Sequence, residues 1–248
     1  MKNSESGTEK KGRYIVNILG VDVVSSLTSS LLKQFEQIIN KKVFVKPFFV
    51  ITANPEILML GQNDGEYQKI LNSADLVIAD GMGLKLAGIK DVTPGRVLAG
   101  ELLSKKLKIF FLGGKNQVAR EMAIKYGGKW DDGHKNIRID PIDLITNERI
   151  INKINKCKPD VLLVAYGSPW QEKWIAENLS KLQAKVVMGV GGAFDYLTGR
   201  TKIPPDFINK AGLEWAWRLW HEPWRWKRQL ALVKFIFFLG REKLIKYF

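Results

Sequence analysis

The sequence LVIADGMG at residues 76–83 joins four consecutive apolar residues to a polar turn that contains two glycines. An apolar run this short, without alternating polar residues, is typical of a strand buried on both faces of a parallel sheet. Glycine allows a tight turn into the helix that we expect to begin near Met82. Asp80 follows the strand directly, so we expect its side chain to project beyond the carboxyl edge of the sheet.

The same pattern recurs along most of the chain. Comparable apolar runs are Tyr14–Leu19, Phe48–Thr52, Lys108–Leu112, Val161–Ala165 and Val186–Val190. The helical stretches between them are Ser25–Asn40, Asn54–Asn72, Asn116–Tyr126, Asn147–Lys156 and Trp170–Leu182. Alternating strands and helices predict one α/β domain over residues 13–199, a Rossmann-like parallel sheet with helices on both faces.

The two ends of the chain differ from this domain in composition. Residues 1–12 are polar and lack apolar periodicity, so we expect disorder there, and they lack the apolar run of a signal peptide. Residues 200–248 contain 11 Lys or Arg, 4 Asp or Glu, and five of the eight tryptophans. We interpret this segment as a helical appendage that docks on a membrane.

The charge of the chain predicts an anionic partner. The net charge is +14, and residues 200–248 contribute +7 of it (11 − 4). Interleaved Trp and Arg residues are typical of a membrane interface, and Leu230–Leu239 is shorter than the ~20 residues that cross a bilayer. Two alternatives remain: a helix pair that packs on the core, and a surface that binds single-stranded nucleic acid. The single Cys157 fits a reducing cytosol.

Polar and glycine residues follow several of the expected strands, at the sheet edge where α/β proteins bind ligands. These residues are Thr52, Asn54, Asp80, Gly81, Gly113, Gly114, Gly167, Gly191 and Gly192. Glycine lets the backbone approach a phosphate at a helix N-terminus. A tight turn also needs glycine for steric reasons, so each turn alone supports both interpretations.

Two side chains at these turns are candidates for chemistry. Asp80 is either a catalytic carboxylate or the cap of the following helix, and the sequence favours the two equally. Gln171 has no capping role, so we expect it to face the pocket, whereas Glu172 can form a capping box with Ser168.

Other kinds of site are disfavoured. His134 and His221 lie far apart in the sequence and Cys157 stands alone, so no zinc site is expected. We interpret Asp131 and Asp132 as a solvated loop. Ser168 lacks the hydrolase context G-x-S-x-G, and neither G-x-G-x-x-G nor a Walker motif occurs. We therefore expect neither a metal nor a cofactor.

A series of motifs in fixed order carries a family resemblance. The motifs are Thr52–Glu56, Asn72–Gly83, Leu112–Gly114, Gly167–Pro169 with Gln171 and Glu172, Gly189–Asp195, and Leu213–Trp215 with Arg218, Glu222, Pro223 and Arg225. Together they resemble the WecG/TagA/CpsF glycosyltransferases over about Gly20 to Gln229.

The resemblance implies an inverting glycosyltransferase that requires no metal. Such enzymes transfer a sugar, often N-acetylmannosamine or its uronic acid, from a UDP-sugar to undecaprenyl-diphosphate-linked N-acetylglucosamine. The products are surface polymers such as wall teichoic acid. The sequence leaves the donor open among N-acetylmannosamine, its uronate, glucose and glucuronate, and leaves the polymer open as well.

The resemblance also assigns roles to residues of this chain. Asp80 matches the proposed general base, Thr52 and Asn54 the sugar pocket, and Gln171 and Arg96 further polar positions of the active site. We expect Asp195 to bind substrate beside the last glycine turn. This chain has Lys202 in place of the family's usual Arg-Ala-Pro element, which leaves the role of Lys202 open.

The appendage receives a role in the same way. We expect Arg218, Arg225 and Arg228 to clamp the acceptor diphosphate while the tryptophans anchor the segment at the membrane. The resemblance thus implies a cytoplasmic enzyme, peripheral at the inner face of the cell membrane, with no nucleic-acid partner. Off the membrane, its apolar face would favour homo-oligomers.

Overall fold

The computed structural model describes residues 7–10, 13–41, 43–134, 137, 143–205, 208, 213–221, 223 and 226–245. The strands are β1 (Gly7–Lys10), β2 (Arg13–Ile18), β3 (Val21–Ser25), β4 (Phe48–Ala53), β5 (Leu76–Ala79), β6 (Ile109–Leu112), β7 (Lys129–Asp131), β8 (Val161–Val164) and β9 (Val186–Gly189). The α-helices are α1 (Thr28–Ile39), α2 (Pro55–Asn63), α3 (Gly65–Ser73), α4 (Gly95–Leu103), α5 (Val118–Tyr126), α6 (Leu144–Cys157), α7 (Trp170–Asn178), α8 (Ala193–Thr198), α10 (Glu214–His221) and α11 (Trp226–Ile245). Two 3-10 helices are η1 (Met82–Ala87) and η2 (Leu179–Lys181).

All the described strands belong to one sheet in the order β1-β2-β3-β5-β4-β9-β8-β6-β7. Every pairing from β3 to β7 is parallel, and β1, β2 and β3 pair antiparallel at one edge. Each parallel strand from β4 to β9, apart from the edge strand β7, is an almost wholly buried apolar run, as the sequence predicted. The predicted α/β fold with a Rossmann-like sheet is confirmed.

The N-terminal edge differs from expectation in one respect. Gly7–Lys10 forms β1 and pairs with β2, with Gly7 opposite Val16, so the expectation of disorder is wrong for these four residues. A two-residue turn at Leu19 and Gly20, both at positive φ, then joins β2 to β3. Positive φ at both positions gives the hairpin the twist that the sheet requires.

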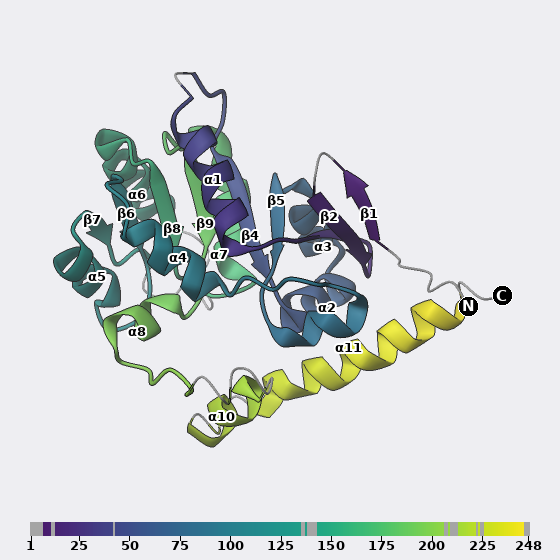
Figure 1. Ribbon diagram of the computed structural model, residues 1–248. Coiled ribbons are helices and arrows are strands. Elements are labelled where there is room, and N and C mark those ends of the chain that lie inside the picture. Colours follow the sequence, from purple (N-terminus) through teal and green to yellow (C-terminus); the bar gives the residue numbers. More distant parts are fainter. Residues whose placement is uncertain are drawn as a thin grey trace.

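Helices cover both faces of the sheet (Figure 1). One buried cluster contains residues of α2, α3, α6, α7 and α11, and the other contains residues of α1, α4, α5 and α8. β4 and its neighbour β9 are followed by helices on opposite faces, α2 and α8. Open α/β sheets bind ligands at the carboxyl ends of strands where the connections diverge in this way.

Local capping explains how the helices next to this edge begin. The stretch predicted as one helix, Asn54–Asn72, is two helices. Asn54 accepts a hydrogen bond from Ile57 N at 3.0 Å and starts α2, and Asp64 accepts from Glu66 N and Tyr67 N and starts α3. Asp64 also pairs with Lys173 of α7 at 2.8 Å, which joins two helices of one face.

The C-terminal helix α11 packs against the domain. It lies along α2 and η1, and its Phe235 and Leu239 are buried in the core (Figure 1). Leu232 approaches Gly83 of η1 so closely that an added Cβ there would lie 3.1 Å from its Cδ1. The alternative of core packing therefore holds for the inner face of α11, while Val233, Ile236 and Phe237 are exposed on the outer face.

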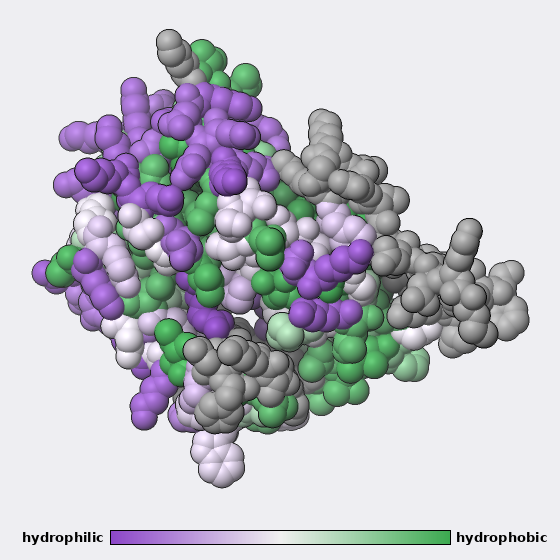
Figure 2. All heavy atoms as spheres, in the orientation of Figure 1, coloured by the Kyte–Doolittle hydropathy of each residue, from purple (hydrophilic) through white to green (hydrophobic). Residues whose placement is uncertain are grey.

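The described surface is divided by polarity. Figure 2 shows hydrophobic side chains gathered where α11 crosses the domain and hydrophilic side chains at the opposite end. Among the helices of the described residues, none is both long enough and apolar enough to cross a membrane. The docking role of the appendage and the boundary at residues 199 and 200 stay predictions.

Candidate active site

Asp80 stands at the carboxyl end of β5, beside the end of β4. Its backbone N–H donates to Ala53 O at 2.7 Å, so the chain segments that carry Asp80 and Asn54 leave the sheet side by side. Gly81, at φ +106°, occupies the N-cap position of η1, so Asp80 stands one residue before that position. Asp80 is therefore not the N-cap residue of η1, and it is half-buried at the predicted edge.

Thr52 is buried in the structure, whereas the resemblance matched it to the sugar pocket. It is 6% exposed, and its Oγ1 donates to Gly189 O of β9 at 3.3 Å. An added Cβ at Gly95 would lie 3.0 Å from Thr52 Oγ1, so glycine at this position lets α4 approach β4 closely. Thr52 therefore holds β4, β9 and α4 together beneath the edge.

Asn54 has a structural role beside any role in binding. Its Oδ1 caps α2, which leaves the amide nitrogen as the group for a ligand. An added Cβ at Gly81 would lie 3.7 Å from Asn54 Cβ, so the Asp80–Gly81 turn and the cap are in contact. The structure thus brings Thr52, Asn54, Asp80 and Gly81 together, as predicted.

Gln171 does not face a pocket, and this expectation is wrong. The side chain is 2% exposed, and its Oε1 accepts hydrogen bonds from Gly167 N at 3.1 Å and Gly191 N at 2.9 Å. Its Nε2 donates to Glu172 Oε1 at 2.7 Å. Gln171 thus joins the turns that follow β8 and β9. It lies at the predicted edge of the sheet, but its side chain is buried beneath that edge.

The glycine turns show why glycine is needed at several positions. Gly113 and Gly114 have φ values of +84° and +88°, and Tyr166 packs so closely on Gly113 that an added Cβ would lie 2.7 Å from its ring. Gly191 has φ +51°, and apart from chain neighbours no atom of the described residues would lie within 4 Å of a Cβ at Gly191 or Gly192. The turn after β6 therefore has a steric explanation, and the turn after β9 has open space beside it.

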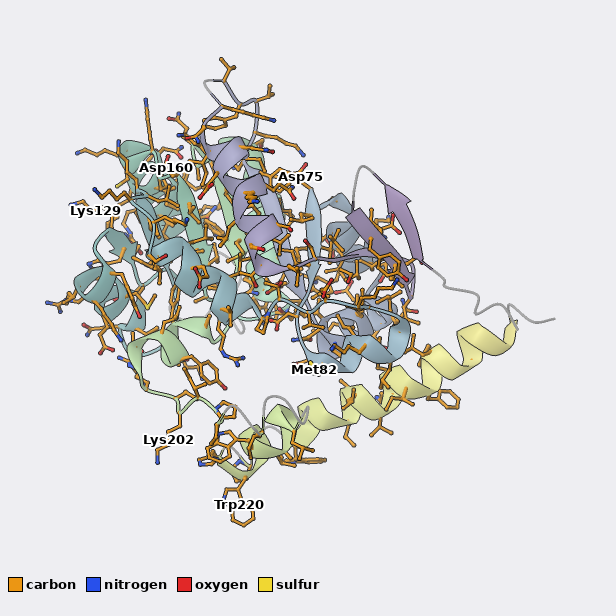
Figure 3. All side chains as sticks on the ribbon, in the orientation of Figure 1. Asp75, Met82, Lys129, Asp160, Lys202 and Trp220 are labelled. Atoms are coloured by element: carbon orange, nitrogen blue, oxygen red, sulfur yellow. The ribbon has the colours of Figure 1, made fainter. Side chains whose placement is uncertain are left out.

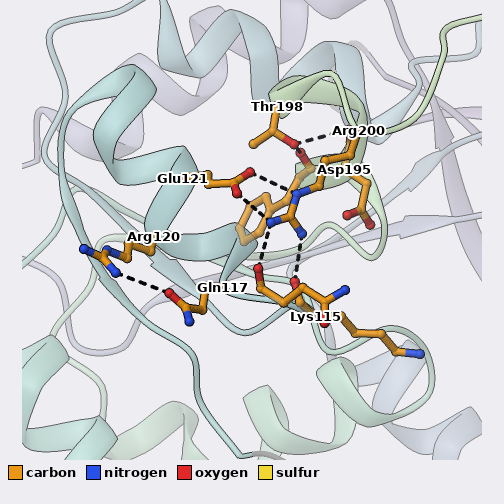
Figure 4. Close-up of polar contacts among 9 residues, drawn as sticks. Lys115, Gln117, Arg120, Glu121, Asp195, Thr198 and Arg200 are labelled. Carbon is orange, nitrogen blue, oxygen red and sulfur yellow. Dashed lines mark hydrogen bonds and ion pairs between the residues drawn. The ribbon is translucent and has the colours of Figure 1, made fainter.

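Arg200 binds the loop that follows the Gly113–Gly114 turn, and sequence reasoning missed this residue. Its guanidinium binds both carboxylate oxygens of Glu121 and the backbone oxygens of Lys115 and Asn116, in the cluster that Figure 4 shows with Asp195 nearby. This ion pair holds the pKa of Glu121 below its ordinary value through the hydrogen bond from Arg200. The signal available in the sequence was only a basic residue after Gly199.

Arg96 and Lys202 lie on the same side of the domain. Arg96 in α4 places its guanidinium carbon 5.6 Å from the centre of the Tyr196 ring in α8, one residue after Asp195. This distance is within the range of a cation–π contact. Lys202 is exposed, and Figure 3 shows it on the segment that leads from α8 toward α10.

Asp131 corrects the prediction of a solvated loop. It ends β7 at 4% exposure, and Arg149 and Lys153 bind it at 2.6 and 2.9 Å. Burial raises its pKa, but the hydrogen bonds from Arg149 and Lys153 outweigh burial and lower the pKa to about 2. These two ion pairs hold α6 against the edge strand β7, away from Asp80.

The predicted acceptor residues fall largely outside the description. Arg225 lies outside the described residues, as do the side chains of Arg218 and Arg228, although α10 and α11 contain their backbones. Within the described part of the chain, no three His, Cys, Asp or Glu side chains gather as a metal site requires. Independence from metal stays a prediction.

Comparisons with known proteins agree with the resemblance. The family model described as "Glycosyl transferase WecG/TagA/CpsF family" matches residues 16–247. An N-acetylglucosaminyldiphosphoundecaprenol N-acetyl-beta-D-mannosaminyltransferase of Bacillus subtilis is 31% identical over 236 residues, 89% of each chain. A Staphylococcus aureus protein of the same name is 30% identical over 237 residues, again 89% of each chain. With a sheet edge that carries Asp80 and the family's motifs in order, this chain belongs to the WecG/TagA/CpsF family of glycosyltransferases.

Proposed function

We propose that this glycosyltransferase moves N-acetylmannosamine from a UDP-sugar to N-acetylglucosaminyl-diphosphoundecaprenol. The names of the relatives support this choice of sugar and acceptor. The structural observation that carries it is the position of Asp80, a half-buried carboxylate at the end of β5, beside Asn54 and one residue before the N-cap of η1. Neither the family nor these relatives support the alternative of a protein that binds single-stranded nucleic acid.

Asp80 supplies the base that an inverting transfer needs. The acceptor hydroxyl oxygen attacks the anomeric carbon from the side opposite UDP, and the Asp80 carboxylate takes the hydroxyl proton. The bond between the anomeric carbon and the UDP oxygen breaks, and UDP leaves with the electron pair. A positioned base contributes about 10²–10⁴-fold to such a step.

The charge of the leaving UDP needs stabilisation by the protein. The turn at Gly191 and Gly192 has open space beside it, and Lys115 is exposed in the loop after β6. Backbone N–H groups and cations of this kind stabilise developing phosphate charge without a metal. Arg96 and Asp195 flank the same region through α4 and α8, which contact each other.

We further propose that the enzyme works at the inner face of the cell membrane. The outer face of α11 exposes Val233, Ile236 and Phe237, and neighbouring η1 exposes Met82 and Leu86. Figure 3 shows Met82 on the side of the domain next to α11, and Trp220 pointing away from the domain. An apolar face in a segment with net charge +7 suits an anionic bilayer. Off the membrane, the same face favours self-association.

A donor screen tests the proposed reaction. The full chain is incubated with a short-chain lipid-diphosphate N-acetylglucosamine acceptor and UDP-N-acetylmannosamine, its uronate, UDP-glucose or UDP-glucuronate, each with and without EDTA. We expect transfer from UDP-N-acetylmannosamine, with inverted anomeric configuration and unchanged by EDTA. Preference for another donor would overturn the choice of sugar, and loss of turnover in EDTA would overturn independence from metal.

A further inference from the structure

Glu172 is a buried carboxylate outside the chemistry described above. It lies in α7, is 1% exposed, and accepts hydrogen bonds from Tyr67 OH at 3.1 Å, Ser168 Oγ at 3.0 Å and Gln171 Nε2 at 2.7 Å. Tyr67 belongs to α3 and is fully buried. Burying a carboxylate is costly unless its oxygens are hydrogen-bonded, so a site of this kind needs an explanation beyond packing.

The carboxylate fixes the direction of the Gln171 amide. With Nε2 toward Glu172, the amide oxygen faces two donors, the backbone N–H groups of Gly167 and Gly191. A flipped amide would place its NH₂ against these two N–H groups and its oxygen against the carboxylate. The Gln171 amide also packs directly on Gly189, where an added Cβ would lie 2.8 Å from Nε2.

The two turns held by Gln171 lie at the candidate active site. Gly167 follows β8, and Gly191 leads through Gly192 into α8, which carries Asp195. The carbonyl of Gly189, just before the second turn, accepts the hydrogen bond of Thr52. A change in the Gln171 amide therefore moves the turn with open space beside it and the helix that follows.

We infer that Glu172, supported by Tyr67, is a positioning residue that holds Gln171 and, through it, the Gly191–Gly192 turn in the geometry that binds the donor diphosphate. The inference rests on the proposed function for its choice of ligand. It predicts that the carboxylate acts on donor binding through hydrogen bonds that an amide can replace and an apolar side chain cannot.

Three variants and one control test it: Glu172→Met, Glu172→Gln, Tyr67→Phe and, on the exposed face of α7, Glu177→Met. UDP affinity is measured by calorimetry, donor KM and kcat by turnover, and protection of the Gly167 and Gly191 amides by hydrogen exchange. We expect Glu172→Met to raise donor KM and the UDP dissociation constant about tenfold, with a smaller change in kcat and reduced protection of both amides. We expect donor KM and the UDP dissociation constant of Glu172→Gln to lie within about threefold of the unaltered enzyme. Tyr67→Phe should raise both constants by a smaller factor than Glu172→Met, and Glu177→Met should leave both unchanged.

The readouts separate the inference from its alternatives. Lower thermal stability of Glu172→Met with unchanged donor KM, UDP affinity and Gly191 protection would overturn the inference, because the carboxylate would then be structural only. If Glu172→Met does not fold, Tyr67→Phe decides by the same readouts. If the unaltered enzyme transfers no sugar, the proposed function fails, and the Gly191 protection still decides whether Glu172 positions the turn.

Discussion

Arg200 donates from Nε and Nη2 to the two carboxylate oxygens of Glu121 at 2.9 and 2.7 Å, and the same guanidinium binds two carbonyls. The carbonyls belong to Lys115 and Asn116, in the loop that follows β6. Asn116 and Gln117 both have positive φ, a conformation that costs energy in residues other than glycine. Arg200 thus joins the end of α8 to a strained loop at the candidate donor site.

Arg200→Lys is expected to loosen this loop. A lysine carries the same charge but lacks the planar fork that binds a carboxylate and two carbonyls at once. We expect the UDP dissociation constant to rise several-fold while the far-ultraviolet circular dichroism is unchanged. Calorimetric titration with UDP measures the effect, and Arg241→Lys, at an exposed position of α11, is the control. Equal UDP affinity in the two variants would show that Arg200 does not shape the donor site.

Asp80→Asn is expected to remove the base and keep the site. The amide has nearly the same shape as the carboxylate but cannot accept the acceptor proton. We expect transfer to fall by about 10²–10⁴-fold while UDP affinity stays within about twofold. Turnover and calorimetry on the same preparation measure both. Near-normal turnover would remove Asp80 from this role, and Asp195 would then be tested, because Glu172 is buried.

Asp131→Asn is expected to make the free energy of unfolding depend less on pH in the acid range. The pKa of Asp131 is lowered from its ordinary 3.8 to about 2, so the ion pair stabilises the fold above about pH 4. This stabilisation is lost as the pH falls through about 2. Arg149 and Lys153 are half-exposed, so we expect the variant to lose about 1–2 kcal/mol at pH 7 and less as the pH approaches 2.

Urea unfolding of both proteins at pH 7, 4 and 2.5 measures this difference. Asp132→Asn is the matched control, because Asp132 is the exposed neighbour of Asp131. A destabilisation that is equal at all three pH values would mean that the charge of Asp131 contributes nothing to stability.

The sequence predicted the central strands closely, because strands buried on both faces leave uninterrupted apolar runs. The predicted strand Leu76–Ala79 coincides with β5, and the predicted strand Phe48–Thr52 ends one residue before β4 does. It missed β7, a three-residue edge strand that contains Lys129 and Asp131. It also missed α4, which begins at Gly95 against Thr52 and lacks a capping side chain.

The candidate site was predicted where local sequence decides it and missed where distant partners do. Asp80 lies at the expected edge because the end of its strand puts it there. The burial of Gln171 depends on Gly191, twenty residues away, and that of Asp131 on Arg149, eighteen residues away. Such pairings come from the order of strands and helices in the sheet, which a single pattern of apolar residues does not contain.

The outer face of α11 gives the last prediction. Val233 and Phe237 are 65% and 68% exposed and lie four residues apart, so they share one side of the helix. Because neither packs on the domain, Val233→Ser with Phe237→Ser is expected to keep the fold. If this face enters a bilayer, the loss of two apolar side chains weakens binding to anionic vesicles by about tenfold or more.

Flotation with vesicles of anionic lipid measures the binding, and size exclusion without lipid measures self-association, which we expect to decrease in the same variant. Ile124→Ser is the control, because Ile124 is 75% exposed on α5, outside the proposed membrane face. Neutral vesicles and ~1 M salt separate the contribution of basic side chains to vesicle binding from that of apolar side chains. Salt at that concentration screens charges beyond about 3 Å. Equal flotation of the double variant and the control would place the membrane contact away from α11.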